Sequence, residues 1–275
     1  MKKSNKYLAK VLKRLSTLDF SKYKKGYFNQ IKILNRIPFE VFDLEPTSTN
    51  YVYRAVINNP DSHYEKISRI AFNPNPQYIS RANLKGQAVA YYACDYDIAL
   101  IEACHDKLKA TNKRTFELTV SKWKIQKKIS VQIINSSSLA QSAGTDLSLY
   151  YERCRSKRKA ILPKKMYRTW YLKTKFIAEQ FAKEISSDMD YYITARYSNQ
   201  ILHKTEIKGI IYPSIRYLYK GFNYALSPQL FEDNSLQLEE VSEYKVVFDE
   251  SDITKYPIII KQYSTCRFDG DNILW

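Results

Sequence analysis

Strand-type and helix-type segments follow one another along this chain without the regular alternation that builds a parallel βαβ sheet. Neither of the two common nucleotide-binding glycine motifs, GxGxxG and GxxxxGK[ST], is present. We therefore expect an α+β fold with a mixed sheet, and not a Rossmann or P-loop domain. Strands are predicted at 51–56, 88–93, 114–122, 129–134, 209–212, 223–226, 244–248 and 258–260, and helices at 5–16, 23–34, 97–106, 147–155, 169–185 and 191–202.

The first two predicted helices form an N-terminal arm. Tyr7, Leu8, Val11, Leu12 and Leu15 recur at helical spacing with lysines between them, which indicates an amphipathic helix. Two prolines, at 38 and 46, then interrupt the pattern. We predict a basic helical arm over residues 1–40 and one main domain over 41–275, in which 57–80 is a long irregular loop.

The net charge of +16 is concentrated in two segments of the chain. Residues 1–35 carry ten Lys and Arg against Asp19, and residues 151–175 carry ten against Glu152, so the remainder is close to neutral. Such segments suit phosphate contacts with nucleic acid, an acidic partner or anionic ligand, or a plain solvated helix surface. Charge alone does not decide between these three interpretations.

The remaining composition predicts a cytoplasmic protein without a metal site. The lysine-rich start lacks the apolar segment of a signal peptide, and no stretch approaches the roughly 20 apolar residues of a membrane span. The four cysteines form no CxxC pair, so we expect reduced, mostly structural thiols. The three histidines form no HExxH or similar cluster, and we expect no dedicated metal site.

Several short motifs follow one another along roughly residues 50–230. Tyr91 precedes Glu102 by eleven residues. The motifs are Tyr53-Arg54-Ala55, Arg81-Ala82-Asn83-Leu84-Lys85-Gly86, Tyr91-Tyr92-Ala93, Ala99-Leu100-Ile101-Glu102 and Gly209-Ile210-Ile211-Tyr212-Pro213-Ser214, followed by Asn223-Tyr224-Ala225-Leu226.

In order and spacing these motifs resemble the RES domain, a family named for an Arg, a Glu and a Ser. The resemblance implies an ADP-ribosyltransferase-like fold, a mixed sheet with flanking helices. It implies a toxin that degrades NAD+ by hydrolysis or phosphorolysis, with NAD+ as substrate and no separate cofactor. It also implies a Xre-type helix-turn-helix antitoxin as partner, through which nucleic acid is contacted only indirectly. A homo-oligomer is compatible with the sequence, and a membrane partner is not expected.

Carried over to this chain, the named residues are Arg54, Glu102 and Ser214, with Arg81, Tyr91 and Asn83 as supporting positions. A guanidinium at 54 or 81 suits the pyrophosphate of NAD+, because its planar fork matches two phosphate oxygens. A tyrosine at 91 suits the flat, cationic nicotinamide ring. Asn83 and Gly86 suit the turn that carries Arg81.

Glu102 is the candidate for the chemistry. Cleavage of the nicotinamide–ribose bond passes through an oxocarbenium-like state, which an ionised carboxylate stabilises as positive charge develops. Ser214 has no visible base to make it a nucleophile, so we expect it to hydrogen-bond a phosphate or the nicotinamide amide. A Cys104–His105 pair is rejected, because adjacent residues on a helix point about 100° apart.

Two other functions stay open from the sequence. The first is transfer of ADP-ribose from NAD+ to a protein target, which uses the same residues. The second is a nucleic-acid-binding module that relies on the two basic segments and needs no catalytic carboxylate.

Overall fold

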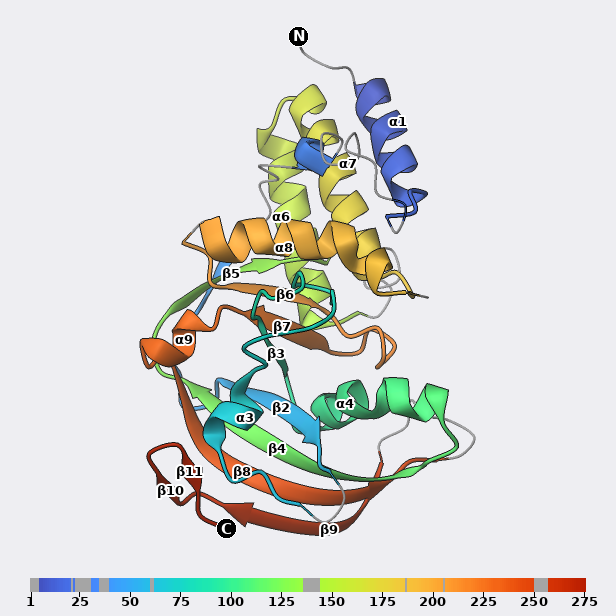
Figure 1. The fold of residues 1–275 in the computed structure, drawn as a ribbon. Helices are drawn as coiled ribbons and strands as arrows, with labels where there is room; N and C mark the ends of the chain where they lie inside the picture. Colours follow the sequence, from blue (N-terminus) through green and yellow to red (C-terminus); the bar gives the residue numbers. More distant parts are fainter. Residues whose placement is uncertain are drawn as a thin grey trace.

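The computed structural model describes residues 5–20, 22, 31–34, 40–59, 62–135, 144–185, 187–204, 206–249 and 257–275. Within these ranges it contains seven α-helices, a nine-stranded sheet and a small two-stranded sheet, β10 (Phe268–Asp269) with β11 (Asn272–Ile273) (Figure 1). The α+β class predicted from the sequence is therefore confirmed. None of the described helices is both long and apolar enough to cross a membrane.

The large sheet brings strands from all parts of the chain together in the order β1-β5-β6-β7-β3-β2-β4-β8-β9. Among the described strands, β5 and β6 run parallel, and every other neighbouring pair is antiparallel. The strands are β1 (Val41–Leu44), β2 (Tyr51–Ile57), β3 (Ala90–Ala93), β4 (Thr115–Ile125), β5 (Ile129–Ile133), β6 (Gly209–Pro213), β7 (Phe222–Leu226), β8 (Leu236–Val247) and β9 (Ile258–Thr265).

The sheet is weakly joined where β2 meets β3. These strands pair only at Tyr53 and Ala93, whereas β2 pairs with β4 along its whole length. The sheet thus falls into two parts, β1-β5-β6-β7-β3 and β2-β4-β8-β9, that diverge from one contact. The short ladder leaves the rest of β2 and β3 without hydrogen bonds to each other at this place in the sheet.

Helices cover the two parts separately (Figure 1). Helix α4 (Tyr96–Ala110) packs Leu100, Ile101, Cys104 and Leu108 against β4 and β8, and the short helices α3 (Ile67–Ala71) and α9 (Gln229–Glu232) lie by the same strands. The other part is covered by α8 (Tyr192–Lys204), beyond which α1 (Asn5–Ser16), α6 (Asp146–Ile161) and α7 (Lys164–Phe181) form a further group of helices.

Helix α1 belongs to the same hydrophobic core as α7 and α8. Its apolar stripe of Leu8, Leu12 and Leu15 is buried with Phe176 and Phe181 of α7. The N-terminal helix is therefore held by the packing of the predicted main domain, although its sequence begins more than 140 residues before α7.

Most predicted elements are present, with shifted ends. Helix 5–16 agrees with α1, and Asp95 caps α4 by accepting a hydrogen bond from the backbone N of Ile98 at 2.8 Å. The prediction of an irregular loop over 57–80 was wrong in part, because α3 forms there on buried Ile70 and Ala71. Of the predicted helix 23–34, residues 23–30 lie outside the described residues, and the described end is a 3-10 turn, Lys32–Leu34.

Candidate active site

A cavity of about 470 Å³ opens beside the contact between β2 and β3. Its volume lies within the range of small-molecule sites, about 300–1,000 Å³. Four residues singled out in the sequence line it: Arg54 on β2, Tyr91 on β3, Glu102 on α4 and Arg81 in the segment before β3. Ser214 and Asn83 are not among the lining residues and lie behind the wall, both buried.

The carboxylate of Glu102 is held from two strand ends. Its Oε1 accepts a hydrogen bond of 2.6 Å from the Ser214 hydroxyl and one of 2.7 Å from Nδ2 of Asn223. Glu102 lies in the second turn of α4, among the buried apolar residues of that helix. The carboxylate is thus fixed through Oε1 by Ser214 at the end of β6 and by Asn223 of β7, while its Oε2 lies 3.2 Å from the Arg216 guanidinium.

The loop between β6 and β7 is built to keep Ser214 in place. The Ser214 hydroxyl also accepts a hydrogen bond from the backbone N of Tyr217, and the Ser214 carbonyl accepts one from Tyr219 N at 2.8 Å. Leu218 and Tyr219 both have positive φ, +50° and +64°, an arrangement that costs about 1–3 kcal/mol per residue. The surrounding packing therefore has to impose this tight loop.

Gly221 ends that loop where it meets α4. A Cβ at this position would lie 2.0 Å from Cδ1 of Ile98 and 3.4 Å from Sγ of Cys94. A side chain at this position therefore requires Ile98 to move. The glycine allows the end of the loop to approach α4 closely.

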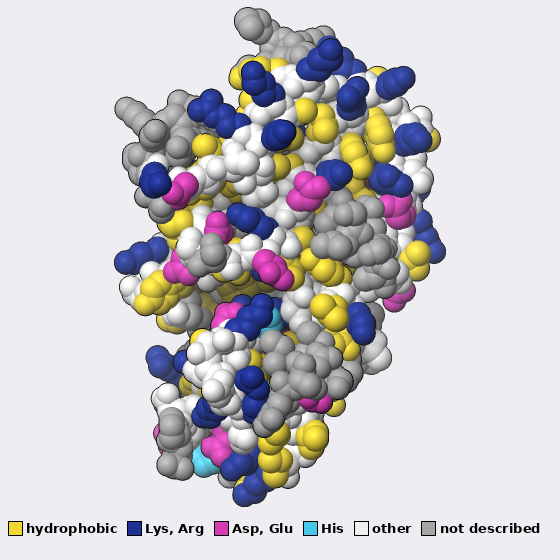
Figure 2. Space-filling model, turned by 90° about the vertical axis from the view of Figure 1, so that its right-hand side faces the viewer, with side chains coloured by type: hydrophobic (Ala, Val, Ile, Leu, Met, Phe, Trp, Pro, Cys, Tyr) yellow, Lys and Arg dark blue, Asp and Glu magenta, His cyan; other side chains and the backbone are white. Residues whose placement is uncertain are grey.

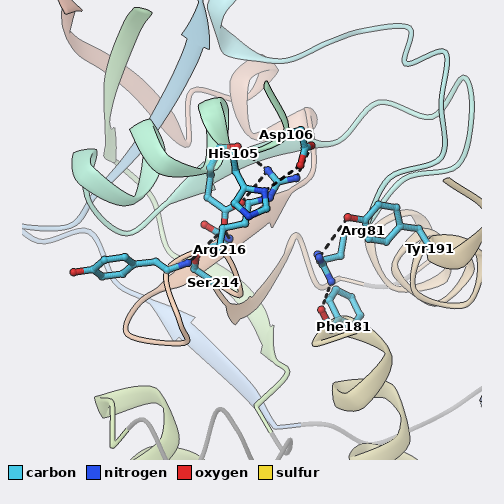
Figure 3. Close-up of polar contacts among 10 residues, drawn as sticks. Arg81, His105, Asp106, Phe181, Tyr191, Ser214 and Arg216 are labelled. Atoms are coloured by element: carbon cyan, nitrogen blue, oxygen red, sulfur yellow. Dashed lines mark hydrogen bonds and ion pairs between the residues drawn. The ribbon is translucent and has the colours of Figure 1, made fainter. Parts of the chain in front are cut away.

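Arg216, in the same loop, neutralises much of the negative charge at this end of the cavity (Figure 3). Its guanidinium lies 3.2 Å from Oε2 of Glu102 and 2.7 Å from Oδ2 of Asp106, and it donates to the Glu102 backbone oxygen at 2.6 Å. Burial lowers the pKa of Arg216, but the two carboxylates outweigh this and the net shift is upward. The pKa of Asp106 is lowered, chiefly by its hydrogen bond with His105 and also by Arg216.

Tyr91 is locked into the wall by its hydroxyl group. The hydroxyl donates to Oδ1 of Asn83 at 2.8 Å and accepts from the backbone N of Ala82 at 2.8 Å. Burial raises the pKa of Tyr91, so the phenol is neutral. Asn83 in turn donates to the backbone oxygens of Tyr78 and Leu84, and so ties the turn to the ring.

Arg54 is a cation without a carboxylate partner. Its Nη1 donates to the backbone oxygen of Tyr91 at 3.1 Å, across the gap between β2 and β3. Its Nε is removed from solvent and has no hydrogen-bond partner among the described residues, and no described carboxylate is within ion-pair distance. Burial lowers the pKa of Arg54.

Arg81 lies on the opposite side of the cavity from Arg216, in the group with Phe181 and Tyr191 (Figure 3). It donates to the backbone oxygen of Phe181 and, at 3.4 Å, to the Tyr191 hydroxyl. Its guanidinium carbon lies 4.9 Å from the centre of the Tyr191 ring, a cation–π contact. In the described part of the chain Arg81, like Arg54, has no ion-pair partner.

Several lining or supporting residues were missed in the sequence. Asn223 stood in a quoted motif but received no role, and Arg216 follows Ser214 by two positions. Proximity to Ser214 was the one signal that pointed to Arg216. Tyr191 comes from a distant helical segment, and nothing in the sequence linked it to Arg81. Cys104, rejected as a nucleophile, is fully buried against β4, and burial raises its pKa to about 12.

The cavity is lined by charges of both signs. Arg54 and Arg81 supply positive charge without carboxylate partners, and the group of Glu102, Asp106 and Arg216 has net negative charge. Among the described residues no cluster of three or more His, Cys, Asp or Glu is suited to a metal ion. Neither a protein-family model nor a curated protein sequence matches the chain.

Proposed function

We propose that this protein binds NAD+ in the cavity and cleaves its nicotinamide–ribose bond, as a hydrolase or phosphorylase that depletes the cellular pool. The resemblance to the RES family suggested this activity, and the arrangement of the cavity supports it independently. On the same basis we propose an ADP-ribosyltransferase-like fold, a cytoplasmic location, a toxin role and a Xre-type antitoxin as its partner.

The observation that carries the proposal is the pair of uncompensated arginines. Removing a cation from water without an anionic partner is costly, and proteins normally pair such groups. Arg216 has two carboxylates, whereas Arg54 and Arg81 have none among the described residues. A ligand with a pyrophosphate group provides the missing negative charge, and guanidinium groups bind phosphate oxygens in bidentate fashion.

Other lining residues suit the nicotinamide half of NAD+. The nicotinamide ring is cationic and flat, and the cavity contains the Glu102 carboxylate together with the rings of Tyr53, Tyr91 and Tyr212. A dipolar ligand that is negative at the pyrophosphate and positive at the nicotinamide thus matches the charge of the cavity.

Glu102 would act as the bond breaks. As nicotinamide leaves, positive charge develops on the ribose, and a carboxylate fixed nearby stabilises that charge without having to reorient. Ser214 and Asn223 hold the carboxylate by one oxygen, and Arg54 and Arg81 hold the phosphates. Nicotinamide leaves as a neutral base, so no general acid is required at this site.

The test is NAD+ consumption by the purified full chain, with the products separated by mass. We expect release of nicotinamide, and a loss of about 10²-fold or more in rate for Glu102→Gln and Glu102→Ala. Glu232→Gln, in an exposed carboxylate on α9, is the matched control and should retain full activity. The second product identifies the acceptor as water, phosphate or a protein.

Intact NAD+ after prolonged incubation with folded protein would contradict the proposal. So would an equal loss of rate in Glu102→Gln and Glu232→Gln. Co-expression with the protein encoded by the adjacent reading frame tests the antitoxin, because growth should be restored only when the two are made together.

A further inference from the structure

The two basic segments of the sequence form a single surface in the folded protein. Helix α1 lies against α7, where Thr169 donates a 2.7 Å hydrogen bond to Oδ1 of Asn5 and Asn5 donates to the backbone oxygen of Lys165. Helix α6 joins α7 through the stacked rings of Tyr151 and Trp170. Lys and Arg side chains are spread over this end of the molecule (Figure 2).

The charge of this surface is largely uncompensated. The three helices carry 14 basic and three acidic residues. Of the basic residues, Arg155, Arg158 and Lys175 form ion pairs. For the other eleven, no ion pair occurs among the described residues: Lys6, Lys10, Lys13, Arg14, Arg153, Lys157, Lys159, Lys164, Lys165, Arg168 and Lys173.

The surface is separate from the cavity. The basic residues that line the cavity are Arg54, Arg81 and Arg216, and none of them lies on α1, α6 or α7. Binding of NAD+ in the cavity would therefore leave this positive charge available for a second, larger anionic partner.

The aromatic residues of these helices indicate which nucleic acid fits. Single strands are bound by exposed rings on which bases stack. Here Trp170 and Tyr151 are buried, and Tyr167 and Tyr171 stack on each other at 6.2 Å, which leaves Tyr7 as the one large exposed ring among the described residues of the three helices. A basic surface that lacks exposed rings for base stacking is suited to the regularly spaced phosphates of a duplex.

The shape of the surface favours DNA over duplex RNA. An amphipathic helix with one buried and one basic face, such as α1, is admitted by the wide major groove of B-DNA, whereas the A-form groove is too narrow. Helix α7 is 18 residues long, about 27 Å, and so has the length of roughly eight base pairs of a duplex. We propose that the α1-α6-α7 surface binds the backbone of double-stranded DNA without sequence specificity.

The test is fluorescence anisotropy of the full chain with a labelled duplex of about 20 base pairs, at salt concentrations from about 50 to about 200 mM. We expect a Kd on the order of 10⁻⁶–10⁻⁴ M near physiological salt, with log K falling linearly with log salt. In the triple variant Lys10→Gln, Lys13→Gln, Lys165→Gln the slope should become shallower by about one unit per lysine that contacts a phosphate.

A matched control separates a defined surface from net charge. Lys85→Gln, Lys107→Gln and Lys109→Gln together remove the same charge from exposed positions outside the three helices. This control should keep the wild-type slope. The proposal would be overturned if the salt slope became equally shallow in both triple variants. Tighter binding to single-stranded DNA, or no binding at about 50 mM salt, would also overturn it. Displacement of the duplex by poly-glutamate at equal charge would also overturn it, in favour of an acidic protein partner.

Discussion

Oγ of Ser214 donates a hydrogen bond of 2.6 Å to Oε1 of Glu102, and this bond joins residues 112 positions apart in the chain. The serine is fully buried, so its hydroxyl serves the carboxylate and not solvent. The contact makes Ser214 a positioning residue for Glu102, whereas the sequence suggested a direct contact with the ligand. The predictions below concern this contact and the loop and charges around it.

Replacing Ser214 by Ala should slow NAD+ cleavage while the protein stays folded. A hydrogen bond to a charged group contributes about 1.5–3 kcal/mol, which corresponds to roughly 10- to 150-fold in rate. The effect should be in kcat, because the arginines that we propose to bind the phosphates are untouched. Ser148→Ala removes an equally buried serine of α6, far from the cavity, and should leave kcat unchanged. Equal kinetics in the two variants would contradict the positioning role.

Replacing Gly221 by Ala should destabilise the protein, because the new methyl group meets Cδ1 of Ile98. Overpacking of this kind costs about 1–3 kcal/mol, measurable as a lower free energy of unfolding in urea. Adding Ile98→Val removes the clashing atom. The double variant should be less destabilised than the sum of the two single variants, and simple additivity would show that the contact does not matter.

Replacing Arg54 by Met should weaken NAD+ binding without lowering stability. The variant removes a desolvated cation that has no carboxylate partner, and such a replacement is often neutral or stabilising. KM should rise by about tenfold or more, because charge-assisted hydrogen bonds to phosphate are lost. Arg216→Met is the comparison variant for stability. It leaves Glu102 and Asp106 without their counter-ion and should reduce stability by about 1–3 kcal/mol. A stability loss in Arg54→Met as large as that in Arg216→Met would contradict the unpaired state of Arg54.

Asp106 should make stability depend on pH in the acid range. Its pKa is lowered from 3.8 by the hydrogen bond with His105 and by Arg216, so the folded protein favours the ionised form. Its stabilising contribution is fully present above the unfolded value and is lost as pH falls through the lower folded value. Urea unfolding of wild type and Asp106→Asn should differ by a constant amount from about pH 5 to 7, and the difference should shrink toward pH 3. If the stability difference between wild type and Asp106→Asn grew below pH 5, the lowered pKa of Asp106 would be contradicted.

Local sequence pattern was sufficient to predict most of the elements, but not β1, α3, α9 or the first half of β8. The spacing of Leu8, Leu12 and Leu15 predicted α1, because amphipathic periodicity acts over a few residues, and the cap that Asp95 provides for α4 is equally local. Helix α3 was missed because it is only five residues long and is held by the burial of Ile70 under the sheet, which no short window reveals. The sequence also identified the cavity-lining positions Arg54, Arg81, Tyr91 and Glu102 before their geometry was known.

What the sequence determined about this protein is its α+β class, most of its helices and strands, its two basic segments and the residue types suited to the cavity. Only the tertiary structure decided that Ser214 and Asn223 hold Glu102, that Arg216 is paired while Arg54 and Arg81 are not, and that the basic segments share one surface. The physical reason is the distance along the chain over which each interaction acts. Helix periodicity and capping depend on neighbouring residues, whereas charge pairing and burial depend on which distant segments the packed core brings into contact.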